Sequence, residues 1–270
     1  MIRVIIQGAA GRMGRMLVNQ VLNDPELTLA AAIEIAASPF LGQDAGTVAG
    51  AKACGVAISA DLDAALRNAD AVIDFSTPAS TRQLAAKAAA HGVAHAIGTT
   101  GLGEDDKAQL RALADTGARI VFAPNMSVGV NLLFALCAKV APLLGADYDI
   151  EVVEMHHNKK QDAPSGTAVR LGEILAQARE LSYQADTRHG RVGMVGARPK
   201  NEIGMHSLRG GDVVGDHTVI FAADGERVEL THKASSRETF AKGAIRAVKF
   251  LAAAKPGLYD MQDVLNLKNL

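Results

Sequence analysis

The alternation of short apolar runs with helical segments in the first half of the chain restricts its fold more than any other feature. Short, apolar runs rich in β-branched residues indicate buried strands, and they occupy residues 2–7, 27–34, 69–76, 94–97 and 118–122. Residues with helical spacing separate them at 11–24, 78–92 and 104–117. Strands that alternate with helices of 10–15 residues predict parallel βαβ units, with helices on both faces of one sheet.

The second half has a different pattern. A long apolar helix is predicted over 128–145, a strand over 148–157 and a helix over 165–180. Two strand patterns around Asp224–Gly225 predict a hairpin, and hence an antiparallel or mixed sheet. An amphipathic helix, 237–257, is expected to pack back on the first domain. We therefore expect one domain from residues 1–126 and 237–270, and a second from 127–236.

Two stretches carry little pattern. Residues 38–61 are rich in Gly and Ala and predict a surface loop with one short strand, and residues 181–201 show no clear periodicity.

Composition excludes several classes of protein. The 28 Lys and Arg residues are balanced by 29 Asp and Glu residues, which argues against a nucleic-acid partner. Cys54 and Cys137 stand far apart without a CxxC motif, so neither a disulfide framework nor a metal site is predicted. The first apolar run is too short for a signal peptide, and no window approaches the about 18 uninterrupted apolar residues of a membrane span. A cytoplasmic protein without a membrane partner is expected.

The glycine pattern after the first strand predicts a nucleotide site. Gly8, Gly11 and Gly14 form GxxGxxG between a strand and a helix, where close backbone approach and helix amides suit a pyrophosphate. Glu34 follows at the end of the second strand, about 20 residues on, where ribose hydroxyls bind. A carboxylate repels a 2′-phosphate and Ile35 follows it, so NADH is favoured over NADPH, although Arg12 is available to offset the repulsion.

Two further strand ends point to the same crevice. Gly98, Thr99 and Thr100 follow one strand, and Ala123, Pro124, Asn125 and Met126 follow the next. Ligands of open parallel sheets bind beyond the carboxyl ends of the strands. The alternative for Thr99 and Thr100 is ordinary helix capping.

The segment EVVEMHHNKKQDAPSGTA gathers groups that carry protons and positive charge. His156 and His157 point to opposite sides of an extended chain, which disfavours a two-histidine metal site and leaves acid–base work or anion binding. Lys159 and Lys160 add charge, and Ser165-Gly166-Thr167 opens a helix with unpaired amides. A substrate that bears carboxylates is predicted; the alternative is a solvated basic loop before a capped helix.

Three residues near the end of the second domain stay open. His232, Lys233 and Arg237 either line the substrate cleft or belong to a surface charge network. Two rival functions also stay open. One is a nucleotide-responsive binding protein, and the other is a semialdehyde dehydrogenase, which needs a nucleophilic cysteine that neither Cys54 nor Cys137 is well placed to supply.

Several motifs together resemble one family. GAAGRMG, IDFSTP, IGTTG, NMSVGVN, EMHHNKKQDAPSGTA, GDVVGDHTVIF, GERVELTHKASSR and GLYDMQDVLNL are similar to those of dihydrodipicolinate reductase, also called 4-hydroxy-tetrahydrodipicolinate reductase, of the bacterial diaminopimelate and lysine pathway. The resemblance runs essentially from end to end. It implies an α/β protein: an N-terminal Rossmann domain, a mixed-sheet domain for substrate binding and tetramerisation, and a C-terminal helix that returns to the first domain.

The resemblance also implies an oxidoreductase in which hydride passes from the reduced nicotinamide to a cyclic, unsaturated dicarboxylate. His156 and Lys160 match the catalytic pair of the family. The resemblance also implies that Lys160 contacts the substrate, together with His157, Gly166 and Thr167. The implied cofactor contacts are Gly8, Ala9, Ala10, Gly11, Arg12 and Met13 at the pyrophosphate, Glu34 at the ribose, and Gly98, Thr99, Thr100, Ala123, Pro124, Asn125 and Met126 at the nicotinamide.

The chain departs from the family pattern at three places. Ile35 replaces an arginine that contacts the 2′-phosphate of NADPH in some members, Asn158-Lys159 replaces a more basic Arg-His pair, and Pro124 and Met126 vary the nicotinamide-side loop.

Overall fold

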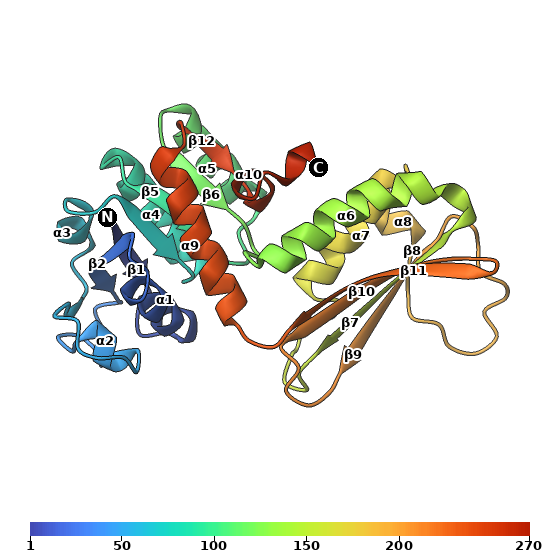
Figure 1. The fold of residues 1–270 in the computed structure, drawn as a ribbon, viewed down its shortest axis with the longest axis horizontal. Coiled ribbons are helices and arrows are strands. Elements are labelled where there is room, and N and C mark those ends of the chain that lie inside the picture. The colour runs from blue at the N-terminus through green and yellow to red at the C-terminus, as the bar shows by residue number, and fades with distance from the viewer. The chain divides into compact units, whose positions relative to one another are not determined.

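The computed structural model describes residues 1–270 and divides them into two compact units (Figure 1). The first unit contains Met1–Val128 and Glu238–Asn269, and the second contains Gly129–Arg237.

The first unit is built on a seven-stranded sheet in the order β12-β6-β5-β4-β1-β2-β3. Its strands are β1 (Ile2–Gln7), β2 (Leu27–Ile33), β3 (Ile58–Ser59), β4 (Ala71–Asp74), β5 (Ala94–Ile97), β6 (Arg119–Phe122) and β12 (Gly257–Tyr259). All neighbours pair in parallel. The chain extends the sheet from β1 through β2 on one side and through β4 on the other. The carboxyl end of β1 is therefore the switch point where ligands of such sheets bind.

Helices cover both faces of this sheet. They are α1 (Arg12–Leu22), α2 (Ala45–Val48), α3 (Leu62–Leu66), α4 (Pro78–Ala90), α5 (Glu104–Asp115), α9 (Glu238–Ala253) and α10 (Met261–Val264). Leu17 and Val21 of α1 share one core with Ala244 and Val248 of α9. The apolar stripe of each helix thus faces the strands. The prediction that the C-terminal helix returns to the first domain is confirmed.

The second unit is a mixed five-stranded sheet in the order β11-β10-β7-β9-β8. Its strands are β7 (Asp149–His156), β8 (Thr187–His189), β9 (Ile203–Arg209), β10 (Gly215–Ala223) and β11 (Glu226–Ala234). β9 runs parallel to β7 and β8, whereas β10 is antiparallel to β7 and β11. The predicted hairpin is confirmed, since Gly225 turns between β10 and β11 with φ +87°, a value that glycine adopts readily.

Helices cover one face of the second sheet (Figure 1). They are α6 (Val128–Leu144), α7 (Gly166–Ala178) and the short α8 (Tyr183–Asp186). Phe134 of α6 and Leu171 of α7 pack with Val152 of β7 and Phe221 of β10 in a separate core. Alternate residues of β7, Ile150, Val152 and Glu154, face that core, so Glu154 is a buried carboxylate in an otherwise apolar row.

Helix α6 with its following turn, Val128–Asp147, is long and apolar enough to cross a membrane by length and composition alone. The sequence had led us to expect no such window. In the structure Val130, Leu133 and Cys137 of this helix are buried against the second sheet, whereas Leu132 and Leu143 are exposed. Packing in this core therefore accounts for part of its apolar character.

The stretches with little pattern contain short elements. The loop 38–61 contains the expected short strand, β3, and also α2. The expectation of an irregular stretch over 181–201 missed α8 and β8, and β9, β12 and α10 were also missed. Elements of three or four residues, such as β8, β12, α8 and α10, are too short to show a period of 2 or 3.6. Strand β9 has seven residues, IGMHSLR, but apolar and polar residues do not alternate regularly along it.

Candidate functional site

The glycine loop has the close-packed backbone that a nucleotide site requires. Gly8 adopts φ +70°, and the Gly8 and Ala9 amides both donate to the Ile33 carbonyl, at 2.8 and 3.1 Å. A Cβ on Gly14 would lie 2.0 Å from the Gly8 carbonyl oxygen, so only glycine fits there. Gly11 is the N-cap of α1 and offers no side chain to its amides. These amides are open to an anion.

Glu34 lies at the carboxyl end of β2, beside this loop. Its Oε1 accepts a hydrogen bond from the Ala10 amide at 2.9 Å, which fixes the carboxylate next to the backbone that would hold a pyrophosphate. Ile35 after it is 66% exposed. Arg12 is exposed, and Arg15, which sequence reasoning did not select, is tied to the loop. The Arg15 Nε donates to the Ala10 carbonyl at 2.8 Å, and its guanidinium lies 5.0 Å from the centre of the Phe40 ring.

The Gly98–Thr100 segment is held by a buried carboxylate. Asp74 at the end of β4 accepts hydrogen bonds from Ser76 Oγ at 2.5 Å and Thr81 Oγ1 at 2.7 Å, and Thr99 Oγ1 lies 3.2 Å away. The His95 Nε2 stands 3.5 Å from it. Burial alone would raise the pKa of Asp74, but the neighbouring His95 and hydrogen bonds from Ser76 and Thr81 leave that pKa below its ordinary value.

The capping alternative for Thr99 and Thr100 is wrong. Helix α5 begins at Glu104 and its N-cap is Gly103, so the Thr99 hydroxyl serves the Asp74 network instead. Gly98 is also needed locally, because a Cβ there would lie 2.2 Å from the Phe75 ring.

The segment from Ala123 to Met126 is held in place by packing against helix α9. Ala123 and Met126 are buried, whereas Pro124 is exposed. Helix α9 presents Gly243 to the Met126 carbonyl so closely that a Cβ would lie 1.8 Å from the oxygen. Asn125 Oδ1 accepts from the Ser127 amide at 2.9 Å. The returning helix therefore fixes the shape of this strand end.

In the second unit, His156 at the end of β7 is held by Glu154. The His156 Nδ1 lies 2.5 Å from Glu154 Oε2, and the Glu154 side chain is 1% exposed. Arg209 of β9 binds both oxygens of the same carboxylate at 2.9 Å. Burial lowers the pKa of His156, and the Lys160 and Arg209 cations act in the same direction, against the raising effect of Glu154.

His217 of β10 packs edge-on against His156, with ring centres 5.2 Å apart. Burial, followed by the neighbouring His156, lowers the pKa of His217 to about 3. His217 is therefore neutral at physiological pH. Its Nε2 lies 3.1 Å from Ser165 Oγ.

Lys160 and Lys159 differ in their surroundings, although they are adjacent. The Lys160 side chain is 19% exposed, and its ammonium binds Asp162 at 2.8 Å. The Lys160 amide also closes a turn on the His157 carbonyl at 3.1 Å. Lys159 and Asn158 are exposed. The alternative of a wholly solvated basic loop therefore does not hold for Lys160, and it describes Lys159.

The predicted helix start at Ser165 is confirmed. Ser165 Oγ accepts from the Ala168 amide at 3.2 Å, which makes Ser165 the N-cap of α7, with Gly166 and Thr167 in the first turn. The Ser165 amide donates to Glu154 Oε1 at 3.2 Å. One carboxylate therefore ties the histidine to the helix start that carries the predicted substrate contacts.

Comparison with known proteins agrees with this arrangement. The family model described as "Dihydrodipicolinate reductase, N-terminus" matches residues 2–126, and "Dihydrodipicolinate reductase, C-terminus" matches residues 129–265. The chain belongs to the dihydrodipicolinate reductase family. Curated relatives named 4-hydroxy-tetrahydrodipicolinate reductase include one from Syntrophotalea carbinolica, 50% identical over 99% of this chain and 100% of the relative. Another, from Cupriavidus necator, is 52% identical over 98% of this chain and 99% of the relative.

A solved structure of the same family is also similar. It is the dipicolinate-bound dihydrodipicolinate reductase from Paenisporosarcina sp. TG-14, with a TM-score of 0.76 and 26% identity over 97% of this chain and 98% of that one. The predicted α/β fold with a second mixed sheet is confirmed.

Within this dihydrodipicolinate reductase fold, sequence reasoning missed Glu154, Arg209 and His217. Glu154 carried a signal, because it stands two residues before His156 and therefore points to the same side of the strand. Arg209 and His217 come from strands that are distant in sequence, and only the sheet pairing brings them to β7. His232 stands directly opposite His217 in the β10–β11 pairing, whereas the roles of Lys233 and Arg237 stay predictions.

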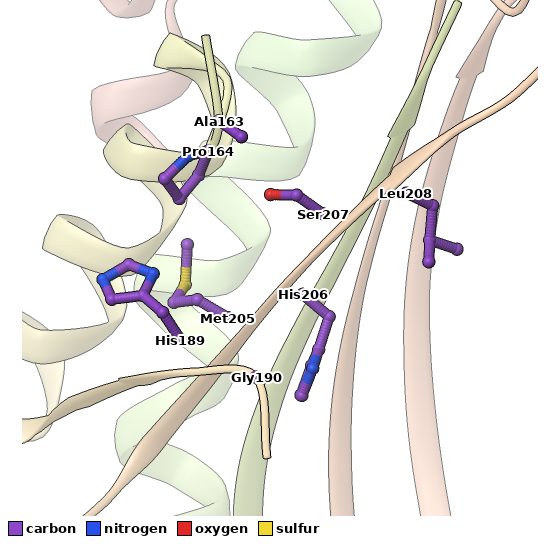
Figure 2. A pocket seen from close by; sticks show the side chains of 8 residues that line it. All are labelled: Ala163, Pro164, His189, Gly190, Met205, His206, Ser207 and Leu208. Carbon is purple, nitrogen blue, oxygen red and sulfur yellow. The ribbon is translucent and has the colours of Figure 1, made fainter. Parts of the chain in front are cut away.

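A cavity of about 510 Å³ lies next to these residues in the chain, at the sheet edge where β9 extends beyond β8 (Figure 2). It is lined by Ala163, Pro164, His189, Gly190, Met205, His206, Ser207 and Leu208. None of the predicted site residues lines it. Ala163 and Pro164 immediately precede Ser165, so the cavity adjoins the start of α7.

Proposed function

We propose that this chain reduces 4-hydroxy-tetrahydrodipicolinate (dihydrodipicolinate) to tetrahydrodipicolinate with a reduced nicotinamide cofactor, in diaminopimelate and lysine biosynthesis. The observation that carries the proposal is the family match over both units, together with the intact segment from His156 to Thr167 gathered around Glu154. The dipicolinate bound to the similar reductase from Paenisporosarcina is a dicarboxylate, and a ligand of that kind suits the positive groups of this segment.

The first unit is the half that we assign to the cofactor. The loop suits a dinucleotide, because its backbone packs so closely at Gly14 that no Cβ fits there. The uncapped amides beside Gly14 suit a pyrophosphate. The residues from Gly8 to Met13 would hold the pyrophosphate, Glu34 the ribose, and Gly98–Thr100 with Ala123–Met126 the nicotinamide. When bound, the reduced cofactor supplies the hydride.

The second unit is the half that we assign to the substrate. Its two carboxylates need cationic or amide partners, and the candidates are Lys160, His157 and the amides of Gly166 and Thr167. Hydride addition leaves negative charge on the conjugated ring nitrogen, which His156 or Lys160 neutralises by giving a proton, directly or through water.

We propose NADH as the preferred cofactor. The Glu34 carboxylate is fixed beside the Ala10 amide, so a 2′-phosphate would meet a fixed negative charge there. Ile35 supplies no cation to balance that charge.

We further propose that the protein is a cytoplasmic homotetramer. No helix of the second unit covers the outer face of its sheet (Figure 1), and Leu208, which stands beside Met155 on that face, is exposed. An uncovered sheet face of this kind suits assembly through sheet packing. Light scattering should then give a mass near four times 28.1 kDa, and a monomeric mass would contradict the assembly.

The experiment that tests the reaction is a coupled assay. Freshly made condensation product of pyruvate and aspartate semialdehyde is supplied, and the loss of reduced-nicotinamide absorbance is followed with NADH and with NADPH. No loss with either cofactor would contradict the proposal. A binding protein without turnover predicts cofactor affinity and no loss of absorbance, so the same assay separates the two.

The semialdehyde dehydrogenase alternative is disfavoured by the state of the cysteines. Burial raises the pKa of Cys137 to about 12, so its thiol carries almost no nucleophilic thiolate at neutral pH. Cys54 lies in the loop before β3, and its amide donates to Asp44 Oδ2 at 3.0 Å in a structural turn.

A further inference from the structure

Every acceptor position of Glu154 is occupied. Oε2 takes hydrogen bonds from Arg209 Nη1 at 2.9 Å and from His156 Nδ1 at 2.5 Å. Oε1 takes hydrogen bonds from Arg209 Nη2 at 2.9 Å and from the Ser165 amide at 3.2 Å. An ionised carboxylate has about four lone-pair sites, and the four contacts use them all.

The chemistry of these partners decides where the protons lie. A guanidinium and a backbone amide can only donate, so three of the four contacts require Glu154 to accept. Arg209 pairs with both oxygens of this buried carboxylate, and a two-pronged guanidinium contact of this kind stabilises the ionised form. Burial raises the pKa of Glu154, but hydrogen bonds from Arg209 and His156 bring that pKa below its ordinary value. An ionised oxygen 2.5 Å from Nδ1 then requires that His156 carry a proton on Nδ1.

We propose that Glu154 and Arg209 are positioning residues that fix one proton of His156 on Nδ1, so that Nε2 is the nitrogen that takes up a second proton from water and passes it to the substrate, which returns the ring to its neutral form. The exchange with the substrate rests on the proposed function, whereas the tautomer follows from the geometry of the second unit alone. His156 Nε2 makes no hydrogen bond within the protein and is not enclosed.

The other groups that face His156 are consistent with this role. Lys160 and Arg209 are cations that disfavour a second proton on the ring, and Glu154 favours it. From β10, the neutral His217 packs on the ring at its edge. No other acceptor competes for Nδ1, so the ring has one orientation and one tautomer.

The opposite face of β7 supplies a contrast within the same strand. Glu151 accepts from His206 at 2.6 Å through Nε2 rather than Nδ1. Arg191 and Arg198 complete its partners, at 2.7 and 2.9 Å. Because His206 Nε2 donates to Glu151, the proton of His206 lies on that nitrogen. The two histidines should be opposite tautomers.

Nitrogen NMR of the full-length protein labelled with ¹⁵N-histidine tests the tautomers directly. At neutral pH we expect His156 to show a protonated Nδ1 and an unprotonated Nε2, and His206 to show the reverse. The variants His156→Gln and His206→Gln assign the signals. A proton on Nε2 of neutral His156 would overturn the proposal. The measurement needs neither substrate nor turnover, so its outcome is independent of the reductase reaction.

Kinetics then test the positioning role. In Glu154→Gln the ring loses its only anionic partner, so we expect kcat to fall by about 10²-fold, the lower end of what acid–base groups contribute. The titration of His156 should also move to lower pH, and the Kd for NADH should stay within twofold. Arg209→Lys keeps the charge but loses the two-pronged contact, and we expect a smaller fall.

The matched control is Glu173→Gln, which removes a carboxylate of α7 that pairs only with the exposed Arg170. It should leave kcat and the pH profile unchanged. If Glu154→Gln does not fold, Arg209→Lys and the wild-type tautomer still decide the matter. Wild-type kcat and an unshifted His156 titration in a folded Glu154→Gln protein would overturn the positioning role.

Discussion

The proposed cofactor half of the site, in the first unit, and the proposed substrate half, in the second unit, depend on different groups of the chain. In the cofactor half the contacts come mainly from backbone, and the decisive feature is the absence of side chains at Gly8 and Gly14. In the substrate half they come from ionisable side chains, gathered on strands around Glu154. The first half depends on shape and the second on protonation state. A change of volume should therefore damage the first, and a change of charge should damage the second.

The largest effect should follow from loss of a proton-carrying group in the substrate half. We expect His156→Gln and Lys160→Ala each to lower kcat by about 10²- to 10⁴-fold, the range that general acid–base groups contribute. The Kd for NADH should hardly change, because neither side chain belongs to the cofactor half. Steady-state kinetics and fluorescence titration of NADH measure the two quantities.

Lys159→Ala is the control for this comparison, because Lys159 is the exposed neighbour. We expect it to change kcat less than twofold. Unchanged turnover in both His156→Gln and Lys160→Ala would remove the acid–base assignment and with it the contrast between the halves.

A change of volume in the cofactor half should come next. In Gly14→Ala the new Cβ would lie 2.0 Å from the Gly8 carbonyl oxygen and 2.7 Å from Ala9 backbone atoms. The loop must shift, so we expect the Kd for NADH to rise by 10-fold or more. Overpacking costs about 1–3 kcal/mol of unfolding free energy. Isothermal titration and urea unfolding give the two numbers.

Gly103→Ala is the matched variant in the same unit. A Cβ there meets no atom within 4 Å, and the Gly103 φ of −81° is open to alanine. NADH binding should survive this change. Equal losses in both variants would mean that Gly14 acts only through general stability.

The cofactor half was predictable from sequence because its determinants are local. Gly8, Gly11 and Gly14 lie within one short segment between a strand and a helix, and strand periodicity places Glu34 at the end of the next strand. The Asp74 network was not predictable in the same way. Asp74 is visible after an apolar run, but its partners His95 and Thr99 meet it only because β4 and β5 pair in one register, and Thr81 reaches it from the first turn of α4.

The substrate half was predictable only in part. The sequence placed His156, Lys160 and the Ser165 helix start in one segment, and their local geometry agrees. It did not predict that Glu154 is the carboxylate that binds His156, Arg209 and the Ser165 amide, since a glutamate in a strand is usually exposed. Arg209 reaches that carboxylate from a strand 55 residues further along the chain, and β9 itself had not been predicted. Pairing between distant strands is absent from local periodicity.

A smaller effect is expected from changing the charge at the ribose end of the cofactor half. Ile35→Arg would place a guanidinium beside Glu34, where it can bind a 2′-phosphate. A hydrogen bond to a charged group contributes about 1.5–3 kcal/mol, so we expect the NADPH/NADH ratio of kcat/KM to rise by about 10-fold or more. Ile35→Lys should raise it less, because lysine lacks the two-pronged geometry. An unchanged ratio would show that this position does not select the cofactor.

The smallest effect concerns stability against pH in the substrate half. Burial lowers the pKa of His217 from 6.5 to about 3, so the unfolded chain binds this proton more readily than the folded protein. The stability contributed by neutral His217 is complete above pH 6.5 and is lost as the pH falls from 6.5 toward 3. Between pH 6.5 and 5.5 this amounts to about 1 kcal/mol of unfolding free energy.

Burial also lowers the pKa values of His156 and His232. The unfolding free energy that these two residues contribute is therefore also lost as the pH falls. His217→Asn should therefore reduce, but not abolish, the slope of urea-unfolding free energy between pH 6.5 and 5.5.

Glu151→Gln is the comparison variant for this prediction. Although burial opposes it, hydrogen bonding from Arg191, His206 and Arg198 lowers the pKa of Glu151 from 4.5 to about 2. Stability from that carboxylate is lost only as the pH falls from 4.5 toward 2. Its removal should leave the slope above pH 5.5 intact, and an equal change of slope in both variants would contradict the assignment to His217.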